Sequence, residues 1–195
     1  CRCLTAPSAS QYDGCLRCSR TLGQISLTQA TQRPRLTFVD FANIYDQGFA
    51  RVAACTIPVA IADPATNAKA VIAQARECHS EGVALAVFPE LCLSGYAIDD
   101  LVMQQPLLDQ VLEGMGEVIA ASKAVGSVLV VGAPLLKGNR LYNCAVVIHQ
   151  GDVLGVVPKT YLPNYREFYE KRWFASGVNV LSDDIDILGE TAPFG

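Results

Sequence analysis

Val83-Ala-Leu-Ala-Val-Phe-Pro-Glu90 is the most informative segment of this 195-residue chain. Its first six residues form an unbroken apolar run, which is typical of a β-strand that is covered on both faces. Pro89 ends the run, so Glu90 stands directly after the predicted strand. Because ligands of α/β sheets bind outside the carboxyl ends of the strands, Glu90 is the first candidate for a functional side chain.

Helical patterns flank this strand on both sides. Asp63-Pro64 offers an N-cap followed by proline at the first helical position. Apolar residues at spacings of three and four then continue to Cys78, and Gly82 suits the end of this helix. A second apolar stripe covers residues 107–119, and Gly126 is its predicted end. We therefore expect one helix before the strand and one after it.

Further apolar runs predict the remaining strands of a sheet. Residues 141–148 and 153–157 flank His149-Gln-Gly-Asp152, which indicates a β-hairpin with a glycine-containing turn. The other strands are expected at residues 51–57, 127–131, 178–181 and 185–188. Strands that alternate with helices and then form a hairpin predict an α/β protein, with helices packed on a mixed sheet.

Composition and charge exclude several classes of protein. Hydrophobic residues make up 51% of the chain and charged residues 17%, which excludes a disordered polymer. No apolar run of about 18 residues is present, so we expect no transmembrane helix and no membrane partner. Residues 1–38 carry a net charge of +4 and the rest a net charge of −8. The acidic body argues against binding to nucleic acid, which needs clustered Lys and Arg.

The first 38 residues differ from the rest of the chain. They hold cysteines in C-x-C and C-x-x-C spacings, a pattern that permits a four-thiolate zinc site, at Cys1, Cys3, Cys15 and Cys18. The segment lacks strong periodicity and has no initiating Met, so we favour a disordered or non-native leader and predict no metal site. An Arg- and Ser-rich transit peptide is a further alternative. Residues 39–195 form the predicted folded part.

A carboxylate and a lysine are the candidates for chemistry. Glu90 at a strand end suits a general base, although a solvated loop acid is the alternative. Lys159 also follows an apolar strand and, beside a carboxylate, could stabilise an oxyanion; a lysine in this position, taken alone, is more often a surface residue. The remaining cysteines, which are expected to be reduced thiols of a cytoplasmic protein, suit a nucleophile poorly; they are Cys55, Cys78, Cys92 and Cys144.

Two segments resemble the nitrilase (carbon–nitrogen hydrolase) superfamily. Residues 87–96 resemble its FPEL-x-L-x-GY segment, and residues 158–170 resemble its lysine segment. Residues 45–55, 94–101 and 162–170 are similar to the amino-terminal glutaminase domains of glutamine-dependent NAD+ synthetases. The resemblance covers residues 45–195. It implies a four-layer α-β-β-α sandwich, which we expect to be incomplete at the C-terminus.

The resemblance also implies roles for individual residues. Members of the superfamily use a Glu–Lys–Cys triad, in which Glu90 would be the general base and Lys159 would stabilise the tetrahedral intermediate. Glu167, eight residues after the lysine, matches an additional glutamate of such sites. Tyr165 matches a position that contacts glutamine. Tyr96 and Phe168 are expected to line the substrate pocket or the exit for ammonia.

The same resemblance implies partners outside these residues. The nucleophilic cysteine is expected beyond residue 195, so the chain alone is expected to be inactive. L-Glutamine is the expected substrate, and a C-terminal ATP-dependent synthetase domain and further copies of the chain are the expected partners. ATP and Mg2+ would serve that domain, and no cofactor is expected here. A stand-alone amidase and a non-catalytic oligomerisation domain are the alternatives.

Overall fold

The computed structural model describes residues 42–180 and 183–195. The predictions made for the leader at residues 1–38, including the zinc site, lie outside the described residues. Within the described residues, neither α-helix is long and apolar enough to cross a membrane.

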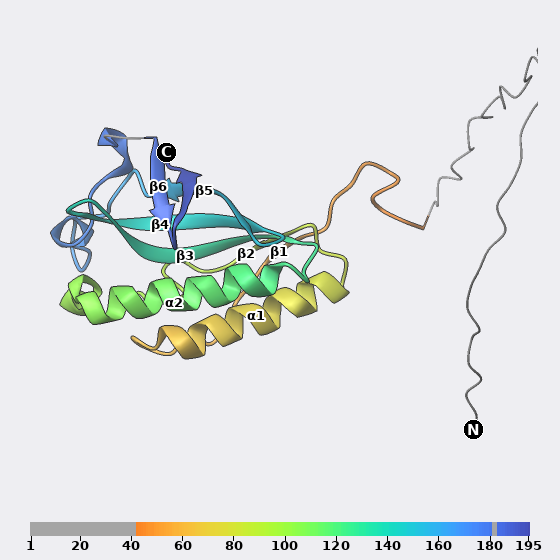
Figure 1. Ribbon diagram of the computed structural model, residues 1–195, viewed down its shortest axis with the longest axis horizontal. Helices are drawn as coiled ribbons and strands as arrows, with labels where there is room; N and C mark the ends of the chain where they lie inside the picture. The colour runs from red at the N-terminus through yellow and green to blue at the C-terminus, as the bar shows by residue number, and fades with distance from the viewer. Residues whose placement is uncertain (1–41, 181–182) are drawn as a thin grey trace, which may run out of the picture. The chain divides into compact units, whose positions relative to one another are not determined.

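A five-stranded mixed sheet forms the centre of the fold (Figure 1). Its strands lie in sequence order, and the first three pair in parallel while the last three pair in antiparallel fashion. Their bounds are β1 Val52–Ala54, β2 Leu85–Val87, β3 Val128–Lys137, β4 Arg140–His149 and β5 Asp152–Pro158. The predicted α/β class and the hairpin after β4 are confirmed. Positive φ angles at Gln150 and Gly151 form its two-residue turn.

Two helices, α1 (Pro64–Ser80) and α2 (Gln105–Ser122), lie side by side on one face of the sheet (Figure 1). The predicted start of α1 is confirmed, because Asp63 accepts a hydrogen bond from the Thr66 N–H at 3.1 Å. The left-handed φ of Gly82 follows the end of that helix.

The predicted end of α2 at Gly126 is wrong, because the helix already ends at Ser122. Gly126 instead donates its N–H to the His79 side chain of α1 at 3.1 Å.

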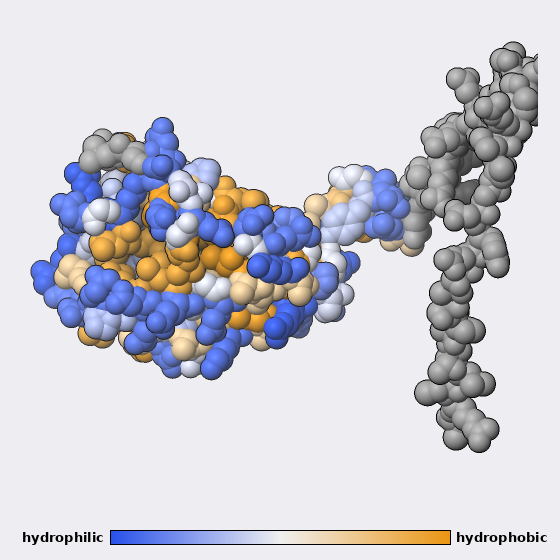
Figure 2. Space-filling model, viewed as in Figure 1, coloured by the Kyte–Doolittle hydropathy of each residue, from blue (hydrophilic) through white to orange (hydrophobic). Residues whose placement is uncertain are grey.

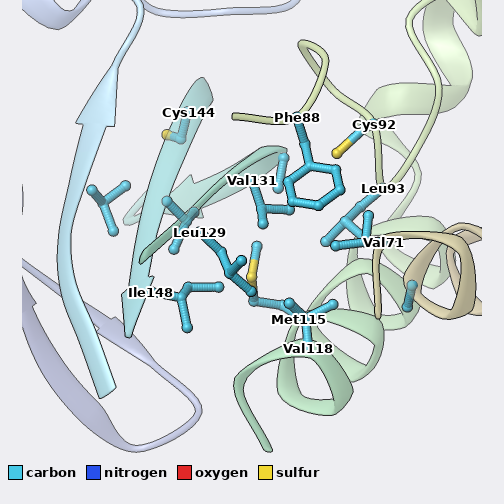
Figure 3. Close-up of a cluster of buried hydrophobic side chains, with 14 of the residues drawn as sticks. Val71, Phe88, Cys92, Leu93, Met115, Val118, Leu129, Val131, Cys144 and Ile148 are labelled. Carbon is cyan, nitrogen blue, oxygen red and sulfur yellow. The ribbon is translucent and has the colours of Figure 1, made fainter. Parts of the chain in front are cut away.

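The hydrophobic core fills the space between these helices and the sheet (Figure 3). Val71 of α1 and Met115 and Val118 of α2 point toward Leu129 and Ile148 of the strands. All five side chains are fully buried. The spacing of the buried residues along the two helices explains why the apolar stripes in the sequence predicted them. The apolar runs predicted the strands because almost all residues of β3 and β4 are buried or half-buried.

A second, two-stranded sheet consists of β6 (Asp184–Ile187) and β7 (Glu190–Pro193). It packs beside α2, because a side-chain carbon at Gly116 would lie 3.0 Å from Leu188. The strand predicted at residues 178–181 is wrong for its described part, since Gly177–Asn179 form a 3-10 helix. β7 was not foreseen.

The opposite face of the five-stranded sheet carries exposed apolar side chains. Val52, Val87 and Val157, from three different strands, are all exposed. Figure 2 shows apolar residues gathered across the upper part of the folded body, where Figure 1 draws the strands. The described residues thus supply one helical layer and one main sheet of the four-layer arrangement that the resemblance implies.

The chain crosses β3 at very close range just after β2. A side-chain carbon at Gly132 of β3 would lie 2.5 Å from both Leu91 N and Pro89 O. Leu91 adopts a left-handed φ of 51°, and the Leu93 N–H donates to the Gly132 carbonyl at 3.3 Å. Glycine at this position therefore allows the segment that contains Glu90 to lie directly on the sheet.

A charged cluster joins two loops that flank this region. Asp100 lies in the 3-10 helix η1 (Asp99–Met103), and Arg172 ends the 3-10 helix η2 (Glu170–Arg172). Asp100 accepts two hydrogen bonds from the Arg172 guanidinium and one from the Trp173 indole, at 2.7–2.8 Å. These bonds hold the pKa of Asp100 below its usual range. We call Asp100, Arg172 and Trp173 the loop clamp.

Replacing Gly132 by alanine tests the close crossing. We expect G132A to lower the free energy of unfolding by about 1–3 kcal/mol, because the added carbon overlaps the backbone of Pro89 and Leu91. Urea denaturation followed by circular dichroism measures this loss. The matched variant G155A, whose nearest contact would be an ordinary 3.8 Å, should change stability much less. Equal losses in both variants would contradict the crossing.

Replacing Asp100 by asparagine tests the loop clamp. We expect D100N to shift the emission of Trp173, the one tryptophan of the sequence, to longer wavelength at neutral pH. The same change should appear in the unmodified protein only under acid conditions. Because folding lowers the pKa of Asp100, its stabilising effect is present above the unfolded pKa and lost as pH falls through the folded value. E113Q removes an exposed charge from α2 and should leave the emission unchanged; an equal shift there would refute the clamp.

Candidate functional site

Three charged side chains meet at the carboxyl ends of two strands. The Lys159 ammonium donates to Glu90 Oε1 at 2.7 Å and to Glu170 Oε1 at 2.9 Å. Glu90 follows β2, Lys159 follows β5, and Glu170 begins η2. We call these three residues the charged triad. The sheet topology brings Glu90 and Lys159 together although 69 positions separate them in the sequence.

The two carboxylates of the triad differ in burial. Glu170 is 1% exposed, whereas the side chain of Glu90 is 44% exposed and that of Lys159 is 28% exposed. Partial burial alone would lower the pKa of Lys159, but the hydrogen bonds to Glu90 and Glu170 outweigh it and raise the pKa above its usual value. Lys159 is therefore a cation at neutral pH, and Glu90 is the carboxylate that a ligand can reach.

Tyr96 completes the surroundings of Glu170. Its hydroxyl donates to Glu170 Oε1 at 2.7 Å. Burial raises the pKa of Tyr96, and the hydrogen bond to Glu170 raises it further. Within the described residues, Glu170 Oε2 is buried and has no hydrogen-bond partner. All the hydrogen bonds that Glu170 accepts through its carboxylate thus fall on one oxygen, Oε1.

Asn143 of β4 holds both exposed members of the triad. Its side-chain amide donates to Glu90 Oε1, and its carbonyl accepts the Lys159 N–H at 2.7 Å. Asn143 is itself buried. Because a strand residue presents its side chain to one face and its carbonyl to a neighbouring strand, a single position orients the carboxylate and fixes the backbone of the lysine.

A cavity of about 380 Å³ opens beside the triad. Its charged and polar lining consists of Glu90, Lys159, Thr160 and Asn143, and its walls are apolar residues of four strands. A wider hollow of about 630 Å³ lies over residues 160–165 and does not include the triad. A mostly apolar cavity with a few convergent polar groups is the usual form of a small-molecule site.

The other predicted residues line hollows that are separate from this cavity. Tyr165 is 64% exposed and lines the wider hollow. Phe168 is partly buried, and its ring centroid lies 5.9 Å from that of Tyr165. Glu167 is exposed and lines a small hollow of about 210 Å³ together with Tyr96 and Phe168. The structure therefore joins Glu90, Lys159 and Tyr96 but leaves Glu167 outside the triad.

Sequence reasoning missed two residues of the site. Glu170, eleven positions after the lysine, occupies the place that was expected for Glu167. The sequence feature that could have indicated Glu170 is an acidic residue among aromatic residues, after Phe168 and before Trp173. Asn143 was missed although it is a polar amide within the apolar run at residues 141–148, a position that calls for a specific partner.

The described cysteines do not join the triad. Burial raises the pKa of Cys92 to about 11 and also raises the pKa of Cys144. Cys144 contributes to the cavity wall but is only 2% exposed. Among the described residues, no cysteine forms a hydrogen bond with Glu90 or Lys159. Cys92 and Cys144 are therefore protonated at neutral pH and are poor nucleophiles.

Curated relatives match over most of the chain. A glutamine-dependent NAD(+) synthetase of Mycobacterium leprae is 53% identical over 161 residues, which make up 80% of this chain and 23% of that protein. The chain thus spans about a quarter of the length of this relative.

Solved structures show the same fold. A glutamine-dependent NAD(+) synthetase of Cytophaga hutchinsonii matches 75% of this chain and 25% of its own, with a TM-score of 0.69 and 25% identity. An amidase from a Nesterenkonia species matches 73% of this chain and 53% of its own, with a TM-score of 0.57. At 21% identity, this second likeness concerns the fold alone.

A comparison with sequence profiles of protein families also gives a match. The sequence profile of the carbon-nitrogen hydrolase family matches residues 51–189, which include the whole charged triad and Asn143. This range is well over half of the chain, and the nitrilase-type α/β fold expected from the sequence is confirmed. The chain belongs to the carbon-nitrogen hydrolase family.

Proposed function

We propose that the chain is the glutamine-hydrolysing part of a glutamine-dependent NAD+ synthetase. The reaction releases ammonia from the side-chain amide of L-glutamine and leaves glutamate. The observation that carries the proposal is the charged triad beside the apolar cavity. The name of the Mycobacterium leprae relative supports the choice of glutamine as the amide.

In this reaction Glu90 acts as the general base. It is the more exposed carboxylate of the triad, and it faces the cavity in which an amide would bind. Glu90 takes the proton of the attacking thiol and later delivers a proton to the leaving nitrogen, so that ammonia departs as the C–N bond breaks. It then activates the water that hydrolyses the thioester and frees glutamate.

Lys159 stabilises the negative charge that develops on the amide oxygen. Its raised pKa keeps it a cation, so it donates to an oxyanion and does not compete with Glu90 as a base. Glu170 holds the ammonium through Oε1, the same oxygen to which the Tyr96 hydroxyl donates. Tyr165, Tyr96 and Phe168 are the residues that we assign to the glutamine pocket, on the strength of the resemblance.

The nucleophile of the proposed reaction is a cysteine thiolate. The resemblance places this cysteine after residue 195. Among the described thiols, Cys78, Cys92 and Cys144 are buried, and Cys55 does not line the cavity beside the triad. Cys144 lines the cavity, but it is only 2% exposed and burial raises the pKa of its thiol.

The remaining proposals concern the whole protein and rest on the resemblance and the relatives' names. Ammonia passes to a C-terminal synthetase domain, where ATP and Mg2+ act on the nicotinic-acid dinucleotide. The resemblance assigns both ATP and Mg2+ to that domain. The protein works in the cytoplasm as a homo-oligomer.

A glutaminase assay of the intact protein tests the proposed function. We expect E90Q to lower kcat by about 100-fold or more, because the amide cannot accept a proton. Ammonia release from L-glutamine and from acetamide should be compared in parallel. A strong preference for acetamide would favour a stand-alone amidase, and unchanged turnover in E90Q would remove Glu90 from the mechanism.

The pair E170Q and E167Q separates the two neighbouring glutamates. We expect E170Q to lower kcat by about tenfold or more, because Lys159 loses one of its two carboxylate partners. That loss also lowers the pKa of Lys159, so the alkaline limb of the pH–rate profile should move to lower pH.

E167Q makes the same chemical change three positions away, at an exposed side chain. Its pH–rate profile should match that of the unmodified protein. A shift in E167Q without one in E170Q would return the role to Glu167, as the sequence had suggested.

A further inference from the structure

Two cysteines that take no part in the proposed reaction lie against each other in the core. Cys55 directly follows β1, and Cys78 lies near the end of α1. Their sulfur atoms are 3.7 Å apart, closer than any other described contact between thiols. The Cys55 N–H donates to the Val87 carbonyl of β2 at 2.8 Å.

The surroundings of the two sulfur atoms differ from those of the other described cysteines. Cys92 donates to the Gly132 carbonyl at 3.5 Å, and Cys144 lies on the wall of the cavity beside the triad. Cys55 and Cys78 have each other as sulfur partners, and Cys55 is partly exposed whereas Cys78 is buried. The Cys55 thiol can thus react with a small oxidant from the solvent, and the Cys78 thiol lies next to it as the second reactant.

We propose that Cys55 and Cys78 are a modification site, at which hydrogen peroxide forms a reversible disulfide between β1 and α1. The sulfur atoms must approach from 3.7 Å to about 2.05 Å. Rotation of the two side chains supplies part of this movement. β1 has only three residues and pairs with a single neighbour, β2, in the described sheet, so its end can move more easily than a central strand.

The chemistry balances with one molecule of peroxide. The sulfur of Cys55 attacks one peroxide oxygen, the O–O bond breaks, and a sulfenic acid and water result. The sulfur of Cys78 then attacks the sulfenic sulfur, the S–O bond breaks, and a second water leaves as the S–S bond forms. The two thiols give up two electrons and two protons in total, and peroxide is reduced to water.

Burial and the neighbouring Cys78 raise the pKa of Cys55 to about 12. Because the thiolate is the reactive form, the first step is slow at neutral pH and needs sustained exposure to peroxide. The second step is then fast, since the partner sulfur is already in contact. A site of this kind distinguishes lasting oxidative conditions from brief ones, and thiol reductants reverse it.

Peptide mapping of the intact protein after peroxide treatment tests the proposal. The folded protein is oxidised, alkylated under denaturing conditions and digested with trypsin. Cleavage after Arg51 and Lys69 releases Cys55 in the peptide 52–69, and cleavage after Arg76 and Lys123 releases Cys78 together with Cys92 in the peptide 77–123. We expect these two peptides to appear joined, with Cys92 alkylated and a mass two hydrogen atoms below the sum of peptide 52–69 and the Cys92-alkylated peptide 77–123, and to separate on reduction.

Two variants identify the partner of Cys55. C92S must keep the joined peptides, and C78A must lose them while its far-ultraviolet spectrum stays that of a folded protein. Failure to detect the joined peptides in the unmodified protein, or their persistence in C78A, would overturn the proposal whatever the protein's activity.

Discussion

The site depends on the two ionic hydrogen bonds that the Lys159 ammonium donates to the carboxylates of Glu90 and Glu170. Glu170 is almost fully buried, and an unpaired carboxylate at such a position would be strongly destabilising. The ammonium offsets that cost, and Tyr96 adds a second donor to the same oxygen. Lys159 therefore has two roles. It holds Glu170 at the start of η2, and it presents a positive charge to any ligand in the cavity.

The backbone around the triad is built to bring its members within reach. Gly132 allows the segment after β2 to cross β3 in direct contact, and Leu91 adopts a left-handed φ within this crossing. Asn143 then ties Glu90 to the same strand that receives the Lys159 N–H. The loop clamp holds η1 against η2 on the other side. Each of these contacts joins residues that are distant in the sequence.

Local patterns predicted the elements, and tertiary geometry decided the details of the site. Asp63-Pro64 and the apolar spacing fixed α1 correctly, because capping and periodicity act within a few residues. The choice between Glu167 and Glu170 could not be read in this way. The two lie three positions apart, and the left-handed φ of Arg166 and the 3-10 turn at Glu170 decide which one faces Lys159. The strand prediction at residues 178–180 was wrong because β-branched residues such as Val178 also occur in short 3-10 helices.

The mixed topology of the sheet implies an order in which the site is assembled. Two-residue turns join β3, β4 and β5, so these strands pair between near neighbours in the sequence. β1 and β2 must instead wait for crossovers through α1 and α2 before they can pair in parallel. Contacts that close short loops generally form at a lower entropic cost. A folding intermediate with only the hairpins would therefore contain Lys159 and Asn143 without Glu90, and the charged triad would be completed only in the final stage of folding.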